Sequence, residues 1–333
     1  MSMTNANFPM DAEGRTYHVG VKRGELANRV LTVGDPARAM ILARHLDGVS
    51  EEEKAPGAKV AVPSNLFSLS SHRGFLTITG RYKGVPVSIV AIGMGISMMD
   101  FFVRECRAVV DGPMLMLRFG SCGSMMDAAV GDIAVPTGSY LVQRNPDYFY
   151  GEEEAKDANA KPYHFTKVFN ADPEVTASLV KHMGAALGED HIWTGINATA
   201  DSFYSSQGRQ DVNFVDTNED LFEQLMAHEP KTVSLEMETF MLYHLAQSST
   251  PATLKKKAQS NGNGVATKEK HSIRAGACMM VFAQRKTNNF ITKEMVAEVE
   301  PKAGAAVFEA LVDVSLGDED DLHTEKGSVW ERK

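Results

Sequence analysis

Short runs of β-branched and apolar residues alternate with helix-length stretches along most of this 333-residue chain. Strands are predicted at 29–33, 85–92, 114–119, 132–136, 192–198, 233–235 and 275–283. Helices are predicted from Pro36, over 99–110, from Pro173 to Gly188, over 238–247 and over 292–316. This alternation is typical of an α/β fold in which helices flank a central parallel or mixed sheet, so it restricts the chain to that fold class.

Three segments lack the period of a helix or a strand. They are 147–162, which is rich in glutamate, 248–271, which carries a lysine run and Asn261-Gly262-Asn263-Gly264, and the acidic tail 317–333. Charged or glycine-containing stretches of this kind are typical of solvated loops. No break in composition divides the remaining chain, so we expect one domain over 17–316, with two surface insertions and a C-terminal tail.

The charge balance limits the partners of the chain. Asp and Glu number 43 against 34 Lys and Arg, which gives a net charge of −9. This charge opposes association with nucleic acid or anionic lipid, but it allows a small anion to be held by a few buried arginines.

Cys106, Cys122 and Cys278 are far apart and odd in number, which favours a reducing compartment. Because neither a secretory signal nor a bilayer-spanning run is visible, we expect a cytoplasmic protein.

Arginines beside glycines and hydroxyl groups mark two predicted strand ends. In Gly34-Asp35-Pro36-Ala37-Arg38, backbone N–H groups at a helix start and a guanidinium could together hold an oxyanion. In 117–123, a buried strand carries Arg118 and Ser121 into a glycine-lined turn. A buried arginine is costly unless it is paired. Two interpretations of Arg118 therefore stay open: an anion ligand, or an ion pair with a structural partner such as Asp132.

Two further segments carry candidate binding residues. The segment 201–209 combines aromatic side chains with Gln207 and Arg209, which suits stacking on a planar ring and reading its carbonyl and N–H edge, although an ordinary loop is the alternative. Leu235-Glu236-Met237-Glu238 places two carboxylates at a strand-to-helix junction. One could bind hydroxyl groups, and the other could simply be an acid at a helix N-terminus. A dinucleotide fingerprint, a Walker lysine motif and convincing zinc spacings are absent from the sequence.

Together these segments resemble the nucleoside phosphorylase family of the trimeric-or-hexameric type, and within it the uridine phosphorylases. The resemblance covers about 17–316, and its motifs follow the family order: Tyr17-His18-Val19-Gly20, 34–38, Ser71-His72-Arg73, 117–123, Val130-Gly131-Asp132, 201–209 and Glu236-Met237-Glu238. It implies a central mixed, twisted and partly barrel-like sheet flanked by helices, with active sites shared across a dimer. It also implies a pentosyltransferase that converts uridine and inorganic phosphate reversibly to uracil and ribose 1-phosphate, without a metal or organic cofactor.

The resemblance assigns roles to individual residues. The implied phosphate ligands are the backbone of Gly34 and the side chains of Arg38, Arg73, Arg118 and Ser121. The implied nucleoside ligands are His18, Phe203, Gln207, Arg209, Met237, Glu238 and Arg285. Arg73 and His18 would come from the neighbouring subunit, and Arg118, Gln207, Arg209 and Glu238 would carry catalysis.

Some positions depart from the family pattern. The turn at 93–99 lacks the usual glycine-glycine-proline-serine run, Ser121-Cys122 replaces paired threonines, and Gly74 stands where bacterial uridine phosphorylases carry a glutamate that binds a monovalent cation. The two insertions add peripheral bulk, so we expect a homodimer rather than a hexamer.

Three alternatives stay open: a purine nucleoside phosphorylase, a nucleosidase of the same family and a non-catalytic nucleoside-binding protein. Purine-cleaving relatives need an acid where this chain has Gln284 and Arg285, which favours uridine. The phosphate-ligand arginines argue against a hydrolase, because water needs no such cluster.

Overall fold

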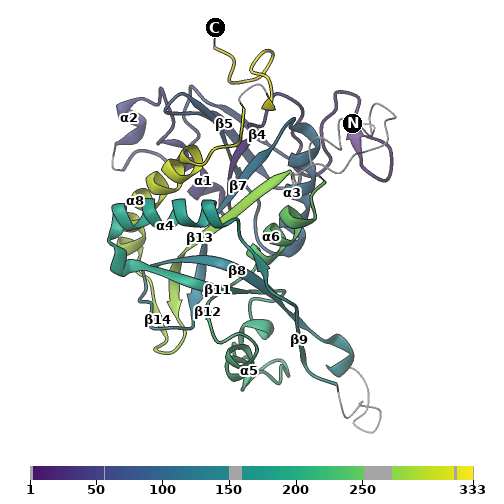
Figure 1. Cartoon of the computed structure of the whole chain (residues 1–333), viewed down its shortest axis with the longest axis vertical. Helices are drawn as coiled ribbons and strands as arrows, with labels where there is room; N and C mark the ends of the chain where they lie inside the picture. The colour runs from purple at the N-terminus through teal and green to yellow at the C-terminus, as the bar shows by residue number, and fades with distance from the viewer. Residues whose placement is uncertain (1–2, 56, 150–159, 251–271, 319–320, 333) are drawn as a thin grey trace.

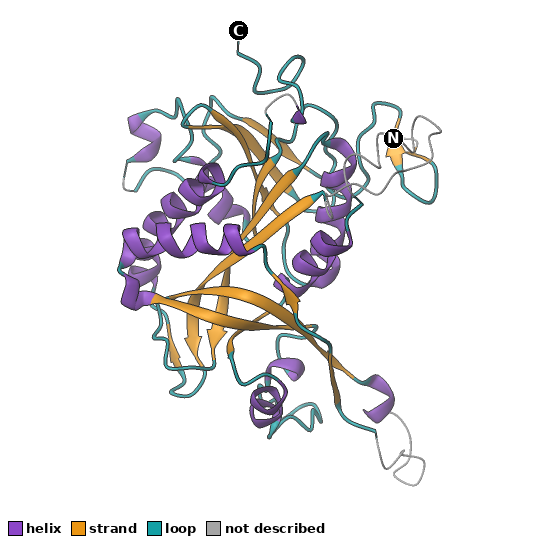
Figure 2. Cartoon of the chain, in the orientation of Figure 1, coloured by secondary structure: helices purple, strands orange, loops and turns teal. Residues whose placement is uncertain are grey.

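The computed structural model describes residues 3–55, 57–149, 160–250, 272–318 and 321–332. Nearly all of the insertion expected at 248–271, and the centre of the one expected at 147–162, lie outside the described residues. Within the described ranges, helices surround one mixed sheet of twelve strands, and a small hairpin of β1 (Met3–Thr4) and β2 (Met10–Asp11) stands apart from it (Figures 1 and 2).

The sheet runs β14-β13-β8-β11-β12-β7-β3-β6-β5-β4, with β9 and β10 paired to β8. Its strands are β3 (Arg29–Val33), β4 (Phe67–Ser70), β5 (Leu76–Tyr82), β6 (Val85–Ala91), β7 (Met114–Ser124), β8 (Ile133–Arg144), β9 (Tyr163–Phe165), β10 (Phe169–Asn170), β11 (Ile192–Ala200), β12 (Thr232–Glu236), β13 (Ile273–Gln284) and β14 (Asn289–Phe290). The helices described are α1 (Pro36–Ala43), α2 (Glu51–Lys54), α3 (Ile96–Val109), α4 (Pro173–Leu187), α5 (Leu221–His228), α6 (Thr239–Ser248) and α8 (Lys293–Asp313). Short 3₁₀ turns occur at 146–149, 189–191 and 205–207.

Part of the sheet closes on itself. β13 pairs in parallel with β7 and antiparallel with β8, and β8, β11, β12 and β7 are each paired to the next. The strands β7, β13, β8, β11 and β12 therefore form a ring, while β3, β6, β5 and β4 extend from β7 as an open sheet. The barrel-like α/β fold implied by the family resemblance is confirmed, and β7, β12 and β13 are fixed beside one another.

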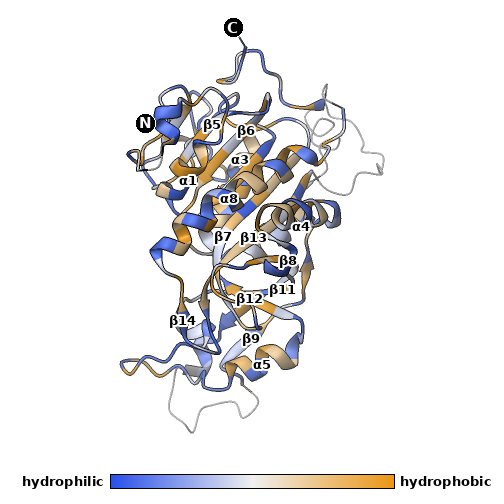
Figure 3. Ribbon diagram, turned by 90° about the vertical axis from the view of Figure 1, so that its left-hand side faces the viewer, coloured by the Kyte–Doolittle hydropathy of each residue, from blue (hydrophilic) through white to orange (hydrophobic). Residues whose placement is uncertain are grey.

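Apolar side chains fill both sides of the open sheet and the outside of the ring. One buried cluster joins the strands to α1, α4 and α8, and a second joins them to α3 and α6. These two groups of helices lie on opposite sides of the central strands in Figure 1, and Figure 3 shows hydrophobic residues along those strands. No helix in the described ranges is long and apolar enough to cross a membrane.

Capping residues define the helices as the sequence predicts. Asp35 accepts a hydrogen bond from the N–H of Ala37 at the start of α1, and Asp172 accepts from Glu174 and Val175 at the start of α4. α4 ends at Gly188, whose φ of 99° is open only to glycine. α1 and α4 each have a proline in the first turn. In α1, the Asp35 cap and Pro36 fix where the helix begins after β3, and therefore where Arg38 lies.

Several features differ from the expectations. β8 continues to Arg144, well beyond the strand expected at 132–136, and the sequence patterns do not predict β4, β5 or α5. β7 does not end at Phe119 but continues through Gly120-Ser121-Cys122-Gly123 to Ser124, because the segment pairs with both β13 and β12. The tail beyond Gly317 is not simply a solvated loop. Val329 N–H donates to the carbonyl of Gly24 (2.8 Å), Arg81 donates to the carbonyl of Trp330 (2.8 Å), and the Trp330 side chain is buried.

Candidate active site

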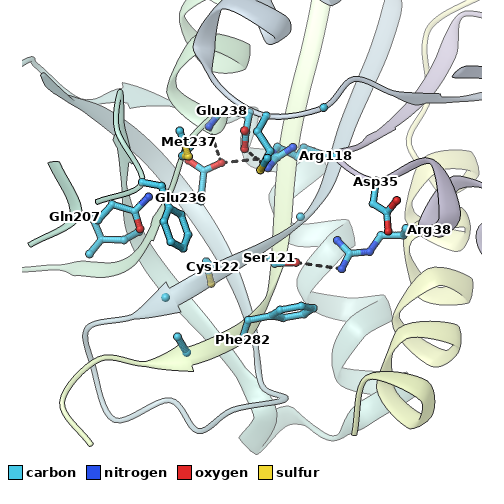
Figure 4. Close-up of a pocket in the computed structure, with 18 of the residues that line it drawn as sticks. Asp35, Arg38, Arg118, Ser121, Cys122, Gln207, Glu236, Met237, Glu238 and Phe282 are labelled. Carbon is cyan, nitrogen blue, oxygen red and sulfur yellow. Dashed lines mark hydrogen bonds and ion pairs between the residues drawn. The ribbon is translucent and has the colours of Figure 1, made fainter. Parts of the chain in front are cut away.

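A cavity of about 510 Å³ opens between the ring and α1, and segments far apart in sequence meet around it (Figure 4). Its lining includes the predicted residues Gly34, Arg38, Arg118, Ser121, Phe203, Gln207, Arg209, Met237 and Glu238. The three arginines in this set come from α1, β7 and the loop after β11. The structure thus brings four separate sequence constellations to one site.

Arg38 and Ser121 form one end of the cavity. Arg38 Nη2 donates to Ser121 Oγ (3.0 Å), and its Nε donates to Glu300 Oε1 (2.6 Å). The guanidinium carbon lies 5.2 Å from the centre of the Phe119 ring and 5.7 Å from that of Phe282. The guanidinium is buried and held on several sides, as an anion ligand on a rigid element should be.

Arg118 is buried deeper, on β7, and is 4% exposed. Its Nε donates to Glu236 (3.2 Å) and its Nη2 forms an ion pair with Glu238, while its buried Nη1 has no hydrogen-bond partner among the residues that the structure describes. The alternative that Asp132 neutralises Arg118 is wrong. Asp132 instead accepts from Trp193 Nε1 (2.9 Å) and contacts His191 Nδ1 (2.8 Å).

The two carboxylates of the strand-to-helix junction have different surroundings. Glu236 accepts from the backbone N–H groups of Glu238 (2.9 Å) and Thr239 (3.0 Å) at the start of α6, and also from Asn197 and Thr199. Glu236 is therefore the acid at the N-terminus of α6, and protein groups occupy most of its hydrogen-bond acceptor positions. Glu238 instead lies against the cavity with Arg118, as Figure 4 shows.

Burial raises the pKa of Glu238, and the neighbouring Glu236 acts in the same direction, while Arg118 opposes the shift. One oxygen of Glu238 accepts the N–H of Gly95. Gly95 has a φ of 98° and precedes α3, so the glycine turn that departs from the family pattern provides a backbone donor to the Glu238 carboxylate. No motif in the sequence points to this role of Gly95.

The opposite end of the cavity is aromatic and amide-lined. Arg209 lies over the Phe203 ring, 3.7 Å from its centre, and donates to Gln207 Oε1 (2.7 Å) and to the Phe203 carbonyl (2.6 Å). Burial, together with the charge of Arg285, lowers the pKa of Arg209 to about 10. Gln207 is 2% exposed. The ring, the amide and the guanidinium are thus joined to one another within the loop that follows β11.

Three predicted residues do not line this cavity. Arg285 donates to the carbonyls of Gln207 (3.0 Å) and Gly208 (3.4 Å), so it supports the amide-lined segment from outside the cavity. His18 stacks on Phe101 and contacts Glu105, and Arg73 contacts the Tyr17 hydroxyl.

Arg73 and Tyr17 line a second cavity of about 400 Å³ on another part of the surface. A role for His18 and Arg73 at the first cavity would therefore require a second copy of the chain.

Several lining residues were missed by the sequence analysis. Phe282 on β13, Phe290 on β14 and Met94 in the glycine turn add apolar surface to the cavity. Gln284 is one of the two residues expected in the region where purine-cleaving relatives have an acid. Its Nε2 donates to the carbonyls of Met126 (2.6 Å) and Ala128 (3.2 Å), so the amide is used to anchor a loop.

The ring-shaped mixed sheet and a cavity lined by arginines, a hydroxyl and a buried carboxylate are those of the phosphorylase superfamily, whose family model matches residues 28–281. The chain belongs to this family.

Within the family, the chain is 28% identical to a uridine phosphorylase of Thermococcus kodakarensis over 86% of this chain and 83% of the relative. It is 35% identical to a solved structure from a study of two uridine phosphorylases of the oomycete Phytophthora capsici. That match has a TM-score of 0.78 and covers 94% of this chain and 100% of the other. A DeoD-type purine nucleoside phosphorylase of Oceanobacillus iheyensis is 30% identical over 69% of this chain and 80% of the relative.

Proposed function

We propose that the chain is a uridine phosphorylase, which converts uridine and inorganic phosphate reversibly to uracil and ribose 1-phosphate in pyrimidine salvage. The observation that carries the proposal is the buried Nη1 of Arg118, which has no partner in the described part of the chain; Arg118 lines the same cavity as Arg38 and Ser121. A buried, unpartnered guanidinium nitrogen is costly unless a ligand pairs with it. A phosphate dianion supplies such a partner, and Arg38 lies at the same cavity to share its charge.

The proposed reaction follows from the two ends of the cavity. A phosphate oxygen attacks the anomeric carbon of the ribose while the bond from that carbon to N1 of uracil breaks, and the electron pair leaves with the base. Arg38, Arg118 and Ser121 would hold phosphate in line, and Glu238 would accept hydrogen bonds from the ribose hydroxyls. Gln207 and Arg209 would stabilise the charge that develops on the uracil oxygens. Positioning and electrostatic stabilisation then supply most of the rate.

The choice of base rests on the amide-lined end. Gln207 presents both a donor and an acceptor, which match the N–H and carbonyl groups of a uracil edge. The family resemblance implies Gln284 and Arg285 near the position of the acid in purine-cleaving relatives, and the amide of Gln284 donates to backbone carbonyls. These contacts favour uridine over a purine nucleoside, although purine nucleoside phosphorylases are among the relatives.

We further propose that the protein acts as a cytoplasmic homodimer, with no metal or organic cofactor. His18 and Arg73 lie away from the cavity of their own chain, and Phe101 and Tyr17 hold them at the surface. A twofold partner could receive both side chains, because a twofold interface presents the same patch from each subunit.

One assay tests the proposed function against its alternatives. Base release is measured from uridine and from inosine, each with and without inorganic phosphate. A uridine phosphorylase releases uracil only with phosphate and forms ribose 1-phosphate. A nucleosidase releases base without phosphate, a purine enzyme prefers inosine, and a binding protein releases neither base, so any of these three results contradicts the proposal.

A further inference from the structure

Arg38 is held by a residue that no sequence motif of the site contains. Its Nε donates to Glu300 Oε1 (2.6 Å), and Glu300 lies on α8, far from Arg38 in the chain. Both side chains are buried, with 8% and 7% of their surfaces exposed. Glu300 does not line the cavity, whereas Arg38 does. Any effect of Glu300 on a ligand therefore passes through Arg38.

The contact between α1 and α8 explains how this pair is formed. Arg38 and Leu42 lie four residues apart on α1, and Glu300 and Gly304 lie four residues apart on α8, so each pair shares a helix face. A methyl group at Gly304 would collide with the Leu42 side chain. The glycine therefore lets α8 approach α1 closely, and one turn away the Glu300 carboxylate reaches the Nε of Arg38.

The remaining contacts of Arg38 leave it little freedom. Ser121 accepts from Nη2 (3.0 Å), and the rings of Phe119 and Phe282 lie near the guanidinium carbon, at 5.2 and 5.7 Å. In the described part of the chain, Nη1 has no hydrogen-bond partner. The carboxylate thus holds one edge of the guanidinium and leaves terminal nitrogens for a ligand.

Arg118 is held in the same way. Its Nε donates to the buried Glu236, and its Nη1 has no partner within the described ranges. Of the three arginines that line the cavity, Arg38 and Arg118 thus each bind a carboxylate at Nε and, among the described residues, keep a terminal nitrogen without a partner. This repeated arrangement indicates orientation of the arginines rather than simple neutralisation.

We propose that Glu300 is a positioning residue for phosphate: it fixes the Arg38 guanidinium, through the close α1–α8 contact, in the orientation that binds the anion. The proposal rests on the proposed phosphorylase function for the identity of the anion. A preoriented arginine loses less conformational freedom on binding, so the position of the carboxylate contributes directly to phosphate affinity.

The test measures binding of inorganic phosphate alone, by calorimetry, in the full-length protein. Glu300→Ala should weaken binding about tenfold, because Arg38 loses its anchor. Glu300→Gln keeps an acceptor oxygen at the same place and should bind phosphate within about threefold of the wild type. Equal weakening by both substitutions would assign the effect to the lost charge and overturn the proposal.

Two further variants separate positioning from general destabilisation. The double variant Arg38→Ala with Glu300→Ala should bind phosphate no more weakly than Arg38→Ala alone, whereas additive losses would show that Glu300 acts independently of Arg38. Glu298→Gln, an exposed neighbour on α8 that pairs with Lys302, should leave binding unchanged.

Uridine turnover is measured in parallel. Glu300→Ala should raise the KM for phosphate more than the KM for uridine, and an equal rise in both would indicate a merely structural role. If phosphate binding depends on Glu300 but uridine is not cleaved, the proposed function is contradicted and the positioning role of Glu300 still holds.

Discussion

The guanidinium of Arg118 and the carboxylate of Glu238 form an ion pair inside the cavity, although the two residues are 120 positions apart in the chain. β7 carries the arginine, and the carboxylate precedes α6. This pair links the end of the cavity proposed to bind phosphate to the part proposed to bind ribose. Each partner offsets the desolvation of the other, so stability and activity depend on the same two side chains.

Replacing Arg118 by Ala should therefore affect both properties. We expect turnover to fall about a hundredfold or more, because a principal anion ligand is lost. We also expect the free energy of unfolding to fall by about 3–5 kcal/mol, because Glu236 and Glu238 keep buried charges without their partner. Steady-state phosphorolysis and urea unfolding measure the two effects. Arg104→Ala, at an exposed arginine of α3, serves as the control. Wild-type activity in the Arg118 variant would remove this residue from the site.

Replacing Gln207 by Ala tests whether this side chain recognises the base. The change removes the amide and also the acceptor of Arg209 Nη1, so kcat/KM for uridine should fall by about 10- to 100-fold. Any activity on inosine should fall much less. Gln210→Ala, in the same loop but outside the cavity, is the matched control. Equal losses on both nucleosides would contradict the assignment of Gln207 to uracil.

The raised pKa of Glu238 predicts a pH dependence. In the proposed reaction the ionised carboxylate accepts hydrogen bonds from the ribose, so activity should be present above the pKa of Glu238 and be lost as the pH falls through it. Because burial raises that pKa, the acid limb of kcat/KM for uridine should lie above the ordinary glutamate pKa of about 4.3. Glu238→Gln should lower the plateau and abolish this limb. A limb that survives in the variant belongs to another group.

The shared active site can be tested by complementation. Arg73→Ala and Arg118→Ala should each be inactive as pure proteins if Arg73 acts across the dimer. Random mixing gives half of the dimers one subunit of each kind, and each mixed dimer contains one complete site. About a quarter of the wild-type activity should then return. Activity that stays absent in mixed dimers verified by mass would place Arg73 in its own subunit's site, and full activity of the pure Arg73→Ala protein would place it outside any site. Sedimentation that reports a stable hexamer would refute the homodimer.

The buried Trp330 predicts a stability effect without a catalytic one. Trp330 is 5% exposed, and the tail that carries it contacts Gly24 and Arg81. Trp330→Ala should lower the free energy of unfolding by about 3 kcal/mol. Activity per folded molecule should be unchanged, because the tail does not line the cavity. Val329→Ala, at a neighbouring side chain that is 41% exposed, should change stability by much less.

Local signals made much of the fold predictable. Asp35-Pro36 and Asp172-Pro173 mark helix starts, and the β-branched run at Arg29–Val33 coincides with β3. The cavity residues were found because strand ends in an α/β sheet converge, and because arginine and glycine are unusual at the end of an apolar strand. Motif order then joined these segments into one site.

Long-range contacts explain what sequence reasoning missed. The continuation of β7 through glycines depends on β12 and β13, which lie on both sides of it. The acid partner of Arg38 is on α8, at a position that no spacing rule connects to α1. Trp330 follows a charged stretch that gives no local signal of burial. The packing of the tail is evident from its contacts with residues that are distant in the sequence.

The closed ring of strands has a consequence for how the site is lost. A strand at the edge of an open sheet can detach by breaking one row of hydrogen bonds, but β13 is bound on one side by β7 and on the other by β8. β7 carries Ser121, β13 carries Phe282, and Glu238 lies just after the end of β12. Because these strands belong to the closed ring, none of the three residues can lose its position independently of the others. Amide hydrogens in the three strands should exchange together, in a single cooperative opening, and the active site should persist until that opening occurs.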